Sequence, residues 1–207
     1  MPARSATRRS LFYRAAMVMV ALGVAAQGAL VLAAESGARL DAILHELAQR
    51  RHGHAAFVER QYLAILERPL ESSGELFYDA PDRVEKRTLR PKPASLLLDQ
   101  GTVTVQRATR TYTASLHDYP QLTALMEGMR ATLAGDRIAL EQSYTLSLDS
   151  VDATNWTLAL VPRDAAVARV VARIRIVGAG AAVHEVEVQL GDGDRSVMTI
   201  HELPGTE

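Results

Sequence analysis

Residues 144–149 read Tyr-Thr-Leu-Ser-Leu-Asp, with an apolar side chain at every second position. A period of two is typical of a half-buried strand, because successive side chains point to opposite faces of a sheet. The same alternation returns in Trp156/Leu158/Leu160, Val170/Ala172/Ile174/Ile176, Val186/Val188/Leu190 and Met198/Ile200. One apolar and one polar face throughout predicts an antiparallel sheet that is covered on a single side.

Shorter β-compatible segments precede this region, and turn residues separate them. They span 57–66, 75–78, 83–89, 96–98, 102–105 and 109–114. Turns such as Ser72-Ser73-Gly74 and Ala80-Pro81-Asp82 leave no room for crossover helices, which favours antiparallel hairpins over βαβ units. Roughly ten strands with few helices would close into a barrel or curl around other elements. We expect one mainly β domain.

Two segments have the helical period instead. Residues 119–133 carry the stripe Leu122, Leu125, Met126, Met129 and Leu133, with Pro120 in the first turn and Gly135 after the end. Residues 36–50 carry Leu40, Ile43, Leu44 and Leu47 at helical spacing, and a shorter helix is expected over 137–142. A curled sheet with one apolar face needs cover on its concave side, and these helices can supply it.

The charge is concentrated unevenly along the chain. Residues 1–34 hold four arginines and no acid, which leaves 19 basic and 24 acidic residues in the remainder. The arginines precede an apolar run from Ala15 to Ala34, a pattern that predicts an export signal over 1–34, cleaved after Ala33 or Ala34. An uncleaved membrane anchor is the alternative, because about twenty residues can span a bilayer. Either way residues 35–207 form the exported domain.

Composition and motifs exclude several classes of site. The chain has no cysteine, which excludes a thiolate nucleophile, a Cys-ligated metal and an N-terminal lipidated cysteine, and its balanced charge argues against nucleic acid. His45-Glu46 begins a zinc-protease pattern that Gln49 interrupts, and no Gly-x-Ser-x-Gly elbow is present. We therefore predict no catalytic residue, no metal and no cofactor. An enzyme would need a buried polar cluster, for which the candidates are His45, His52, His54, Glu59 and Lys86.

A series of short motifs resembles the bacterial outer-membrane lipoprotein carrier family, LolA. The matching pieces, in order over about residues 38–202, are His54-Ala55-Ala56-Phe57, Ser73-Gly74-Glu75-Leu76, Pro81, Pro91, Leu98-Asp99-Gln100-Gly101, Asn155-Trp156-Thr157-Leu158-Ala159-Leu160-Val161-Pro162 and a final Gly-Asp-Gly-Asp between two strands. Each piece is weak alone, but their order and spacing are fairly specific.

The resemblance implies a half-open antiparallel β-barrel with lid helices across its mouth and an apolar cavity for acyl chains. It implies a periplasmic carrier without a cofactor, which takes an acylated lipoprotein from an inner-membrane donor complex to an outer-membrane acceptor. Another lipid is an equally open cargo, and we expect a monomer. The alternative function is a membrane-anchored domain that senses lipid and signals to a partner.

The chain departs from the family pattern at three places. Ala80 stands where these carriers have an arginine that ties the lid to the barrel, and Glu59 replaces a common glutamine. The segment Arg83-Val84-Glu85-Lys86-Arg87-Thr88 is far more charged than a lining strand should be. The barrel is thus expected to be inherited, whereas the latch and the partner contacts are left open.

The predicted lipid-binding residues come from the two amphipathic helices and from the apolar faces of the strands. They are Leu40, Ile43, Leu44, Leu47, Leu122, Leu125, Met126, Met129, Leu133, Leu76, Val103, Val105, Leu146, Leu148, Trp156 and Leu158. Met126 and Met129 are flexible enough to repack against chains of different shape. The same stripe would equally suit an ordinary core, since inward-facing Leu and Val look alike in a filled and a hollow barrel.

Overall fold

The computed structural model describes residues 36–118, 120–150 and 154–204. The chain divides into two compact units, residues 1–40 and residues 41–207. In the first unit, residues 36–40 are helical. The predicted signal and its boundary at residues 34 and 35 lie outside the described residues.

The second unit is built on a single antiparallel sheet of eleven strands, one more than the rough number expected. The strands are β1 (His52–Tyr62), β2 (Leu70–Asp79), β3 (Arg83–Arg90), β4 (Ala94–Asp99), β5 (Thr102–Arg107), β6 (Arg110–Ser115), β7 (Tyr144–Ser150), β8 (Asn155–Pro162), β9 (Val171–Ala179), β10 (Ala182–Leu190) and β11 (Arg195–Glu202). Their order is β6-β5-β4-β3-β2-β1-β11-β10-β9-β8-β7. The first strand pairs with the last, so β6 and β7 form the two edges.

The helices lie mainly in the connection between these two edge strands. It contains η1 (Leu116–Asp118), α2 (Pro120–Leu133) and α3 (Arg137–Ser143), and residues 41–48 are also helical. Gly135 separates α2 from α3 with a φ of +67°, and a Cβ there would lie 2.2 Å from the Leu44 carbonyl oxygen. Two causes therefore exclude a side chain at this position, namely the backbone conformation and the close approach of the helix over residues 41–48. A four-residue helix, α4 (Ala165–Ala168), was not expected from the sequence.

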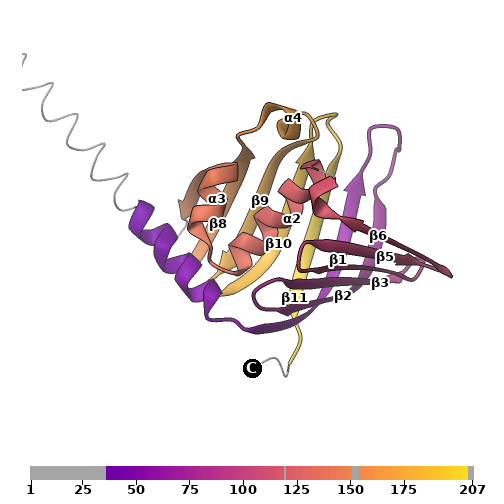
Figure 1. Cartoon of the computed structure of the whole chain (residues 1–207), viewed down its shortest axis with the longest axis horizontal. Coiled ribbons are helices and arrows are strands. Elements are labelled where there is room, and N and C mark those ends of the chain that lie inside the picture. The colour runs from indigo at the N-terminus through magenta and orange to yellow at the C-terminus, as the bar shows by residue number, and fades with distance from the viewer. Residues whose placement is uncertain (1–35, 119, 151–153, 205–207) are drawn as a thin grey trace, which may run out of the picture. The chain divides into compact units, whose positions relative to one another are not determined.

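The sheet curls around α2. Met126 of α2 packs with Leu98 of β4 and Val103 of β5, and the same helix contacts β9. In a flat sheet β5 and β9 would lie roughly 34 Å apart, whereas a 14-residue helix is about 21 Å long. Figure 1 shows α2 and α3 across one face of the curved sheet. The predicted fold class is confirmed as a half-open antiparallel β-barrel with helices over its mouth.

Pairing register assigns each strand residue to a face, because residues directly opposite one another share a face. Tyr78, Val84, Leu98 and Val103 form one row on the inner face, which the helices cover. Val170 was expected on this face, and that prediction is wrong. It precedes β9 and is 45 % exposed, while Val171 is buried, because the register shifts between Gln189 and Leu190.

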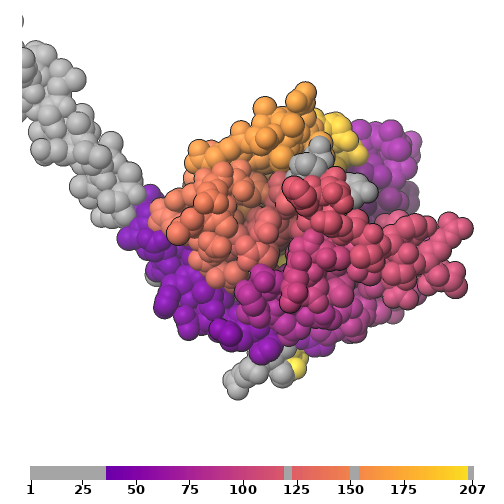
Figure 2. All heavy atoms as spheres, in the orientation of Figure 1, coloured from indigo at the N-terminus to yellow at the C-terminus, as the bar shows by residue number. Residues whose placement is uncertain are grey.

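The inner face differs between the two halves of the sheet. On β8 and β9 it is sealed, with almost no exposed surface on Trp156, Leu158, Leu160, Ile174 and Ile176. On the strands from β2 to β5 and on β10 and β11, many apolar side chains on this face remain partly exposed. Viewed with all atoms drawn, α2 and α3 hide most of β10 behind them (Figure 2).

Candidate functional site

The helical members of the predicted site lie mostly in packed surroundings. Ile43, Leu44 and Leu47 are buried in the helix over residues 41–48. Met126 belongs to a cluster with Leu98, Val103 and Leu116, and Leu125 and Met129 pack at its margin. Leu133 is partly exposed, Leu40 belongs to the first unit, and the side chain of Leu122 lies outside the described residues.

The strand members all lie on the inner face but differ in access. Trp156 is 1 % exposed and Leu158 is 0 % exposed, so they form core beneath the helices. Leu146, Leu148, Leu76 and Val105 are partly exposed, and Val103 is buried against α2. The binding role of these residues remains a prediction. Leu146 and Leu148 lie on β7 next to β8, whereas Leu76 and Val105 lie on the side of the sheet away from β8.

A band of partly exposed apolar side chains runs across that side. We call it the inner apolar band. It consists of Leu76, Val84, Leu96, Val105, Val186, Val188, Met198 and Ile200. Six of the eight were not in the predicted site, although the alternation of β10 and β11 placed Val186, Val188, Met198 and Ile200 on the apolar face.

An ion pair interrupts the inner apolar band. The Lys86 ammonium donates a hydrogen bond to Glu59 Oε2 at 2.6 Å, and its nitrogen lies 4.9 Å from the centre of the Phe57 ring. Lys86 reaches from β3 across β2 to β1, and the register places Gly74 between them. A Cβ at Gly74 would lie 2.0 Å from the Arg87 carbonyl oxygen, so this crossing point has no side chain.

Glu59 is charged despite its burial. Burial raises the pKa of its carboxyl, but the charge of Lys86 and hydrogen bonds from Lys86, Ser196 and Ser72 outweigh it, so the pKa lies below the ordinary 4.5. The hydroxyl of Ser196 donates to Oε1 at 2.7 Å and that of Ser72 to Oε2 at 3.2 Å. The charged segment that departed from the family pattern thus sends Lys86 inward and Arg83, Glu85 and Arg87 outward. Period-two alternation starting from Val84 is the signal that finds Lys86.

The five residues considered for catalysis do not gather. Glu59 and Lys86 meet on the inner face, whereas His54 stacks on Phe77 at 4.5 Å on the outer face. His52 Nδ1 contacts Asp79 Oδ1 at 2.9 Å in an exposed pair, and His45 is exposed on its helix. Within the described ranges, no three His, Asp or Glu side chains are grouped as metal ligands.

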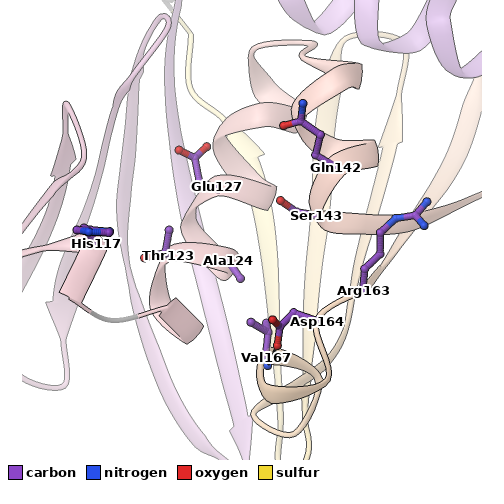
Figure 3. A pocket seen from close by; sticks show the side chains of 9 residues that line it. All are labelled: His117, Thr123, Ala124, Glu127, Gln142, Ser143, Arg163, Asp164 and Val167. Carbon is purple, nitrogen blue, oxygen red and sulfur yellow. Dashed lines mark hydrogen bonds between the residues drawn. The ribbon is translucent and has the colours of Figure 1, made fainter.

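A groove of about 440 Å³ flanks α2 on another side. Figure 3 shows Thr123, Ala124 and Glu127 along α2, facing Gln142 and Ser143 of α3 and a group from the β8–α4 region. That group is Arg163, Asp164 and Val167, and His117 lies at the far end. Asp164 caps α4 and Arg163 Nε donates to the Tyr144 carbonyl oxygen at 2.9 Å. Two of the charged groups therefore already serve the fold.

An ion pair connects α2 to the rim of the barrel. Ala80 cannot form an ion pair, but Arg130 of α2 lies 3.4 Å from Asp82, in the turn between β2 and β3. Arg130 also contacts Glu127 at 2.6 Å and Asp136 at 3.8 Å. In this ion pair the helix α2 supplies the arginine, Arg130, and the barrel supplies the acid, Asp82.

Several solved structures have some similarity to this chain, each at low sequence identity. A LolA superfamily protein from Nitrosomonas europaea is 12 % identical, with 80 % of this chain and 93 % of that chain covered and a TM-score of 0.41. The Mycobacterium tuberculosis lipoprotein LppX is 10 % identical, with 80 % of this chain and 98 % of that chain covered and a TM-score of 0.40. The Pseudomonas aeruginosa MucA/MucB structure is 13 % identical, with 78 % of this chain and 55 % of that chain covered and a TM-score of 0.44. No curated protein matches the chain.

One match concerns the sequence itself. The family model described as outer membrane lipoprotein carrier protein LolA-like matches residues 32–200, which is most of the chain. No helix among the described residues is both long enough and apolar enough to span a membrane. The matched region contains the whole inner apolar band and all eleven strand starts. The chain therefore belongs to the LolA-like family of outer membrane lipoprotein carrier proteins.

Proposed function

We propose that this protein is a periplasmic carrier that binds the acyl chains of a lipoprotein or another lipid and moves them toward the outer membrane. Membership of a family described as carriers supports the proposal. The observation that carries it is the inner apolar band, where eight apolar side chains keep partial access to solvent inside a curled sheet. An ordinary core would seal these residues, as it seals Leu158 and Ile174.

Burial of hydrocarbon supplies the binding free energy. Each buried methylene contributes about 0.8 kcal/mol, so a sixteen-carbon chain could gain up to about 12 kcal/mol. This exceeds the net contribution of a single hydrogen bond, which is about 1 kcal/mol. The area of the inner apolar band should therefore set the affinity, and polar contacts should set the orientation of the cargo.

Helix α2 is the element that admits and releases cargo in this proposal. Its apolar contacts with β3–β5 run through Leu125, Met126 and Met129, whose side chains can repack around a chain. The Arg130–Asp82 pair holds its other side to the barrel rim. Opening of α2 would let an inner-membrane donor load the barrel and an outer-membrane acceptor empty it.

Lipid recovered with the protein tests the proposal. The full chain is expressed in a bacterium, purified from the periplasmic fraction and extracted, and the extract is analysed by mass spectrometry. Delipidated protein is then titrated with a fluorescent eighteen-carbon fatty acid. We expect co-purified acyl lipid and saturable uptake of the probe.

Two neighbouring residues of β5 provide a matched pair of variants. Val105 lies on the inner face and Thr104 on the outer face, and both are partly exposed. V105D should weaken uptake of the probe at least tenfold, because a carboxylate would border the bound chain, whereas T104D should leave uptake unchanged. Lipid-free protein without uptake, or equal effects of the two variants, would contradict the proposal.

A further inference from the structure

The two side chains of the Glu59–Lys86 ion pair differ in their access to solvent. The Glu59 side chain is 9 % exposed, and both of its carboxylate oxygens already accept hydrogen bonds. The Lys86 side chain is 25 % exposed. A ligand on the inner face would therefore meet the ammonium of Lys86 rather than the carboxylate.

Lys86 keeps hydrogen-bonding capacity for such a ligand. An ammonium has three N–H donors, and in the described part of the chain Lys86 donates to Glu59 alone. The Phe57 ring lies beside the same nitrogen. Glu59 holds the ammonium in position, and the remaining N–H groups point in directions away from that carboxylate. A second acceptor can thus bind without displacing the first.

We propose that Lys86 is the head-group site of the carrier and that it binds the carboxylate or phosphate of an amphiphile whose acyl chain lies along the inner apolar band. This inference rests on the proposed lipid-binding function and names the ligand class. Hydrogen bonds between an ammonium and an anionic oxygen are roughly twice as strong as neutral ones, which favours an anionic head over an alcohol or ester. The surrounding apolar side chains strengthen the interaction further by excluding water.

The test compares ligands that share a chain and differ in the head. Delipidated full-length protein is titrated with hexadecanoate and with hexadecanol, and in a second series with palmitoyl lysophosphatidate and with monopalmitoylglycerol. Affinity is measured by displacement of a neutral fluorescent lipid. We expect at least one anionic ligand to bind about tenfold more tightly than its neutral counterpart, and the tighter series identifies the head as carboxylate or phosphate.

A charge-neutral double variant locates the preference. E59Q/K86M removes both charges together, so that no buried charge is left alone, and K86R keeps the cation. The control is R60M/E71Q, which removes an outward-facing pair between β1 and β2, with Nε and Oε2 3.0 Å apart. E59Q/K86M should lose the tenfold preference and keep its affinity for the neutral ligand, whereas K86R and the control should keep both.

The outcomes separate this inference from the proposed function. Equal binding of charged and neutral ligands by the wild-type protein overturns the head-group site and leaves lipid binding in place. A preference that persists in E59Q/K86M overturns the role of Lys86. Failure of every ligand to bind overturns the proposed function, and the head-group site with it. Circular dichroism of each variant confirms that a lost preference does not reflect a lost fold.

Discussion

At the scale of single residues, the protonation state of Glu59 is coupled to the stability of the fold. Its pKa in the folded protein is below 4.5, since the partners Lys86, Ser196 and Ser72 outweigh the effect of burial. A depressed pKa contributes stability that is present above pH 4.5 and is lost as the pH falls through the lower, folded value. At pH 7, E59Q should destabilise the protein by about 2 kcal/mol, because it leaves Lys86 without its anion.

The difference between E59Q and wild type should shrink below pH 4.5, where the wild-type carboxyl takes up its proton. Urea unfolding at a series of pH values between 3 and 7 measures this. E71Q is the control, because Glu71 forms a pair with Arg60 on the exposed outer face and should matter by less than about 1 kcal/mol. A pH-independent difference for E59Q would show that the pair with Lys86 does not stabilise the fold.

Two buried tyrosines should respond oppositely to removal of the hydroxyl. Tyr144 Oη donates to the Ala124 carbonyl oxygen, whereas Tyr78 Oη has no partner among the described residues. Y144F should cost about 1 kcal/mol, and Y78F should be neutral or slightly stabilising, because an unsatisfied buried hydroxyl is itself unfavourable. Urea midpoints at pH 8 compare the two variants, and equal losses would contradict the assignment.

Tyr144 also predicts how the stability of the protein changes at alkaline pH. Burial, with a smaller contribution from the charge of Glu127, raises the pKa of Tyr144 from 10.0 to about 12. A raised pKa contributes stability that is complete below pH 10 and is lost as the pH rises through the folded value of about 12. Between pH 10 and about pH 12, the urea midpoint of the wild-type protein should therefore fall more steeply than that of Y144F.

At the scale of elements, the attachment of α2 to the barrel rim should be weak enough to open. Asp82 is 45 % exposed, and its distance to Arg130 is 3.4 Å. D82N should change the global stability by less than about 1 kcal/mol but increase hydrogen exchange of α2 amides about two- to threefold. D99N is a matched control, because Asp99 is equally exposed and pairs with Arg83 of β3 rather than with α2. Unchanged exchange in α2 would exclude a latch role.

The sequence predicted those elements in which a periodic pattern repeats several times. It failed where an element was short or where the pairing register between two strands shifted. The stripe ending at Leu133 gave α2, and the alternation from Tyr144 gave β7, because each repeats one period several times. Helix α4 has four residues, too few to show a period, and its cap at Asp164 was the available signal. Val170 was misplaced because β9 itself has a bulge, where the consecutive residues Gln189 and Leu190 oppose Arg173 and Val171, and a bulge changes the register without a mark in the alternation.

The site was harder to predict than the fold for a related reason. Alternation tells which face a residue occupies, and it correctly placed Leu76, Val105, Trp156 and Leu158 together on the inner face. It does not tell how far each position lies from the covering helices. That distance depends on the curl of the sheet, which seals Leu158 and leaves Leu76 partly exposed.

At the scale of the whole molecule, the connectivity explains how a curled sheet can stay open. The chain builds β1 to β6 outward on one side, crosses the inner face through α2 and α3, and builds β7 to β11 back to β1. The edges β6 and β7 are joined by the helices rather than by hydrogen bonds to each other. The barrel can thus widen at this seam without breaking a pair in its ladder, so a bound chain can be accommodated at small cost.

Cargo should therefore stabilise the folded state as a whole. A ligand that binds the native protein alone adds about 2.7 kcal/mol at a hundredfold excess over its Kd. For a domain of this size that corresponds to an increase in Tm of roughly 5–10 °C. Calorimetry of delipidated protein with increasing hexadecanoate measures the shift, and a two-carbon acid with the same head is the control, since it lacks the chain that supplies the free energy. An equal shift with the short acid would mean that charge, and not burial of hydrocarbon on the inner apolar band, drives binding.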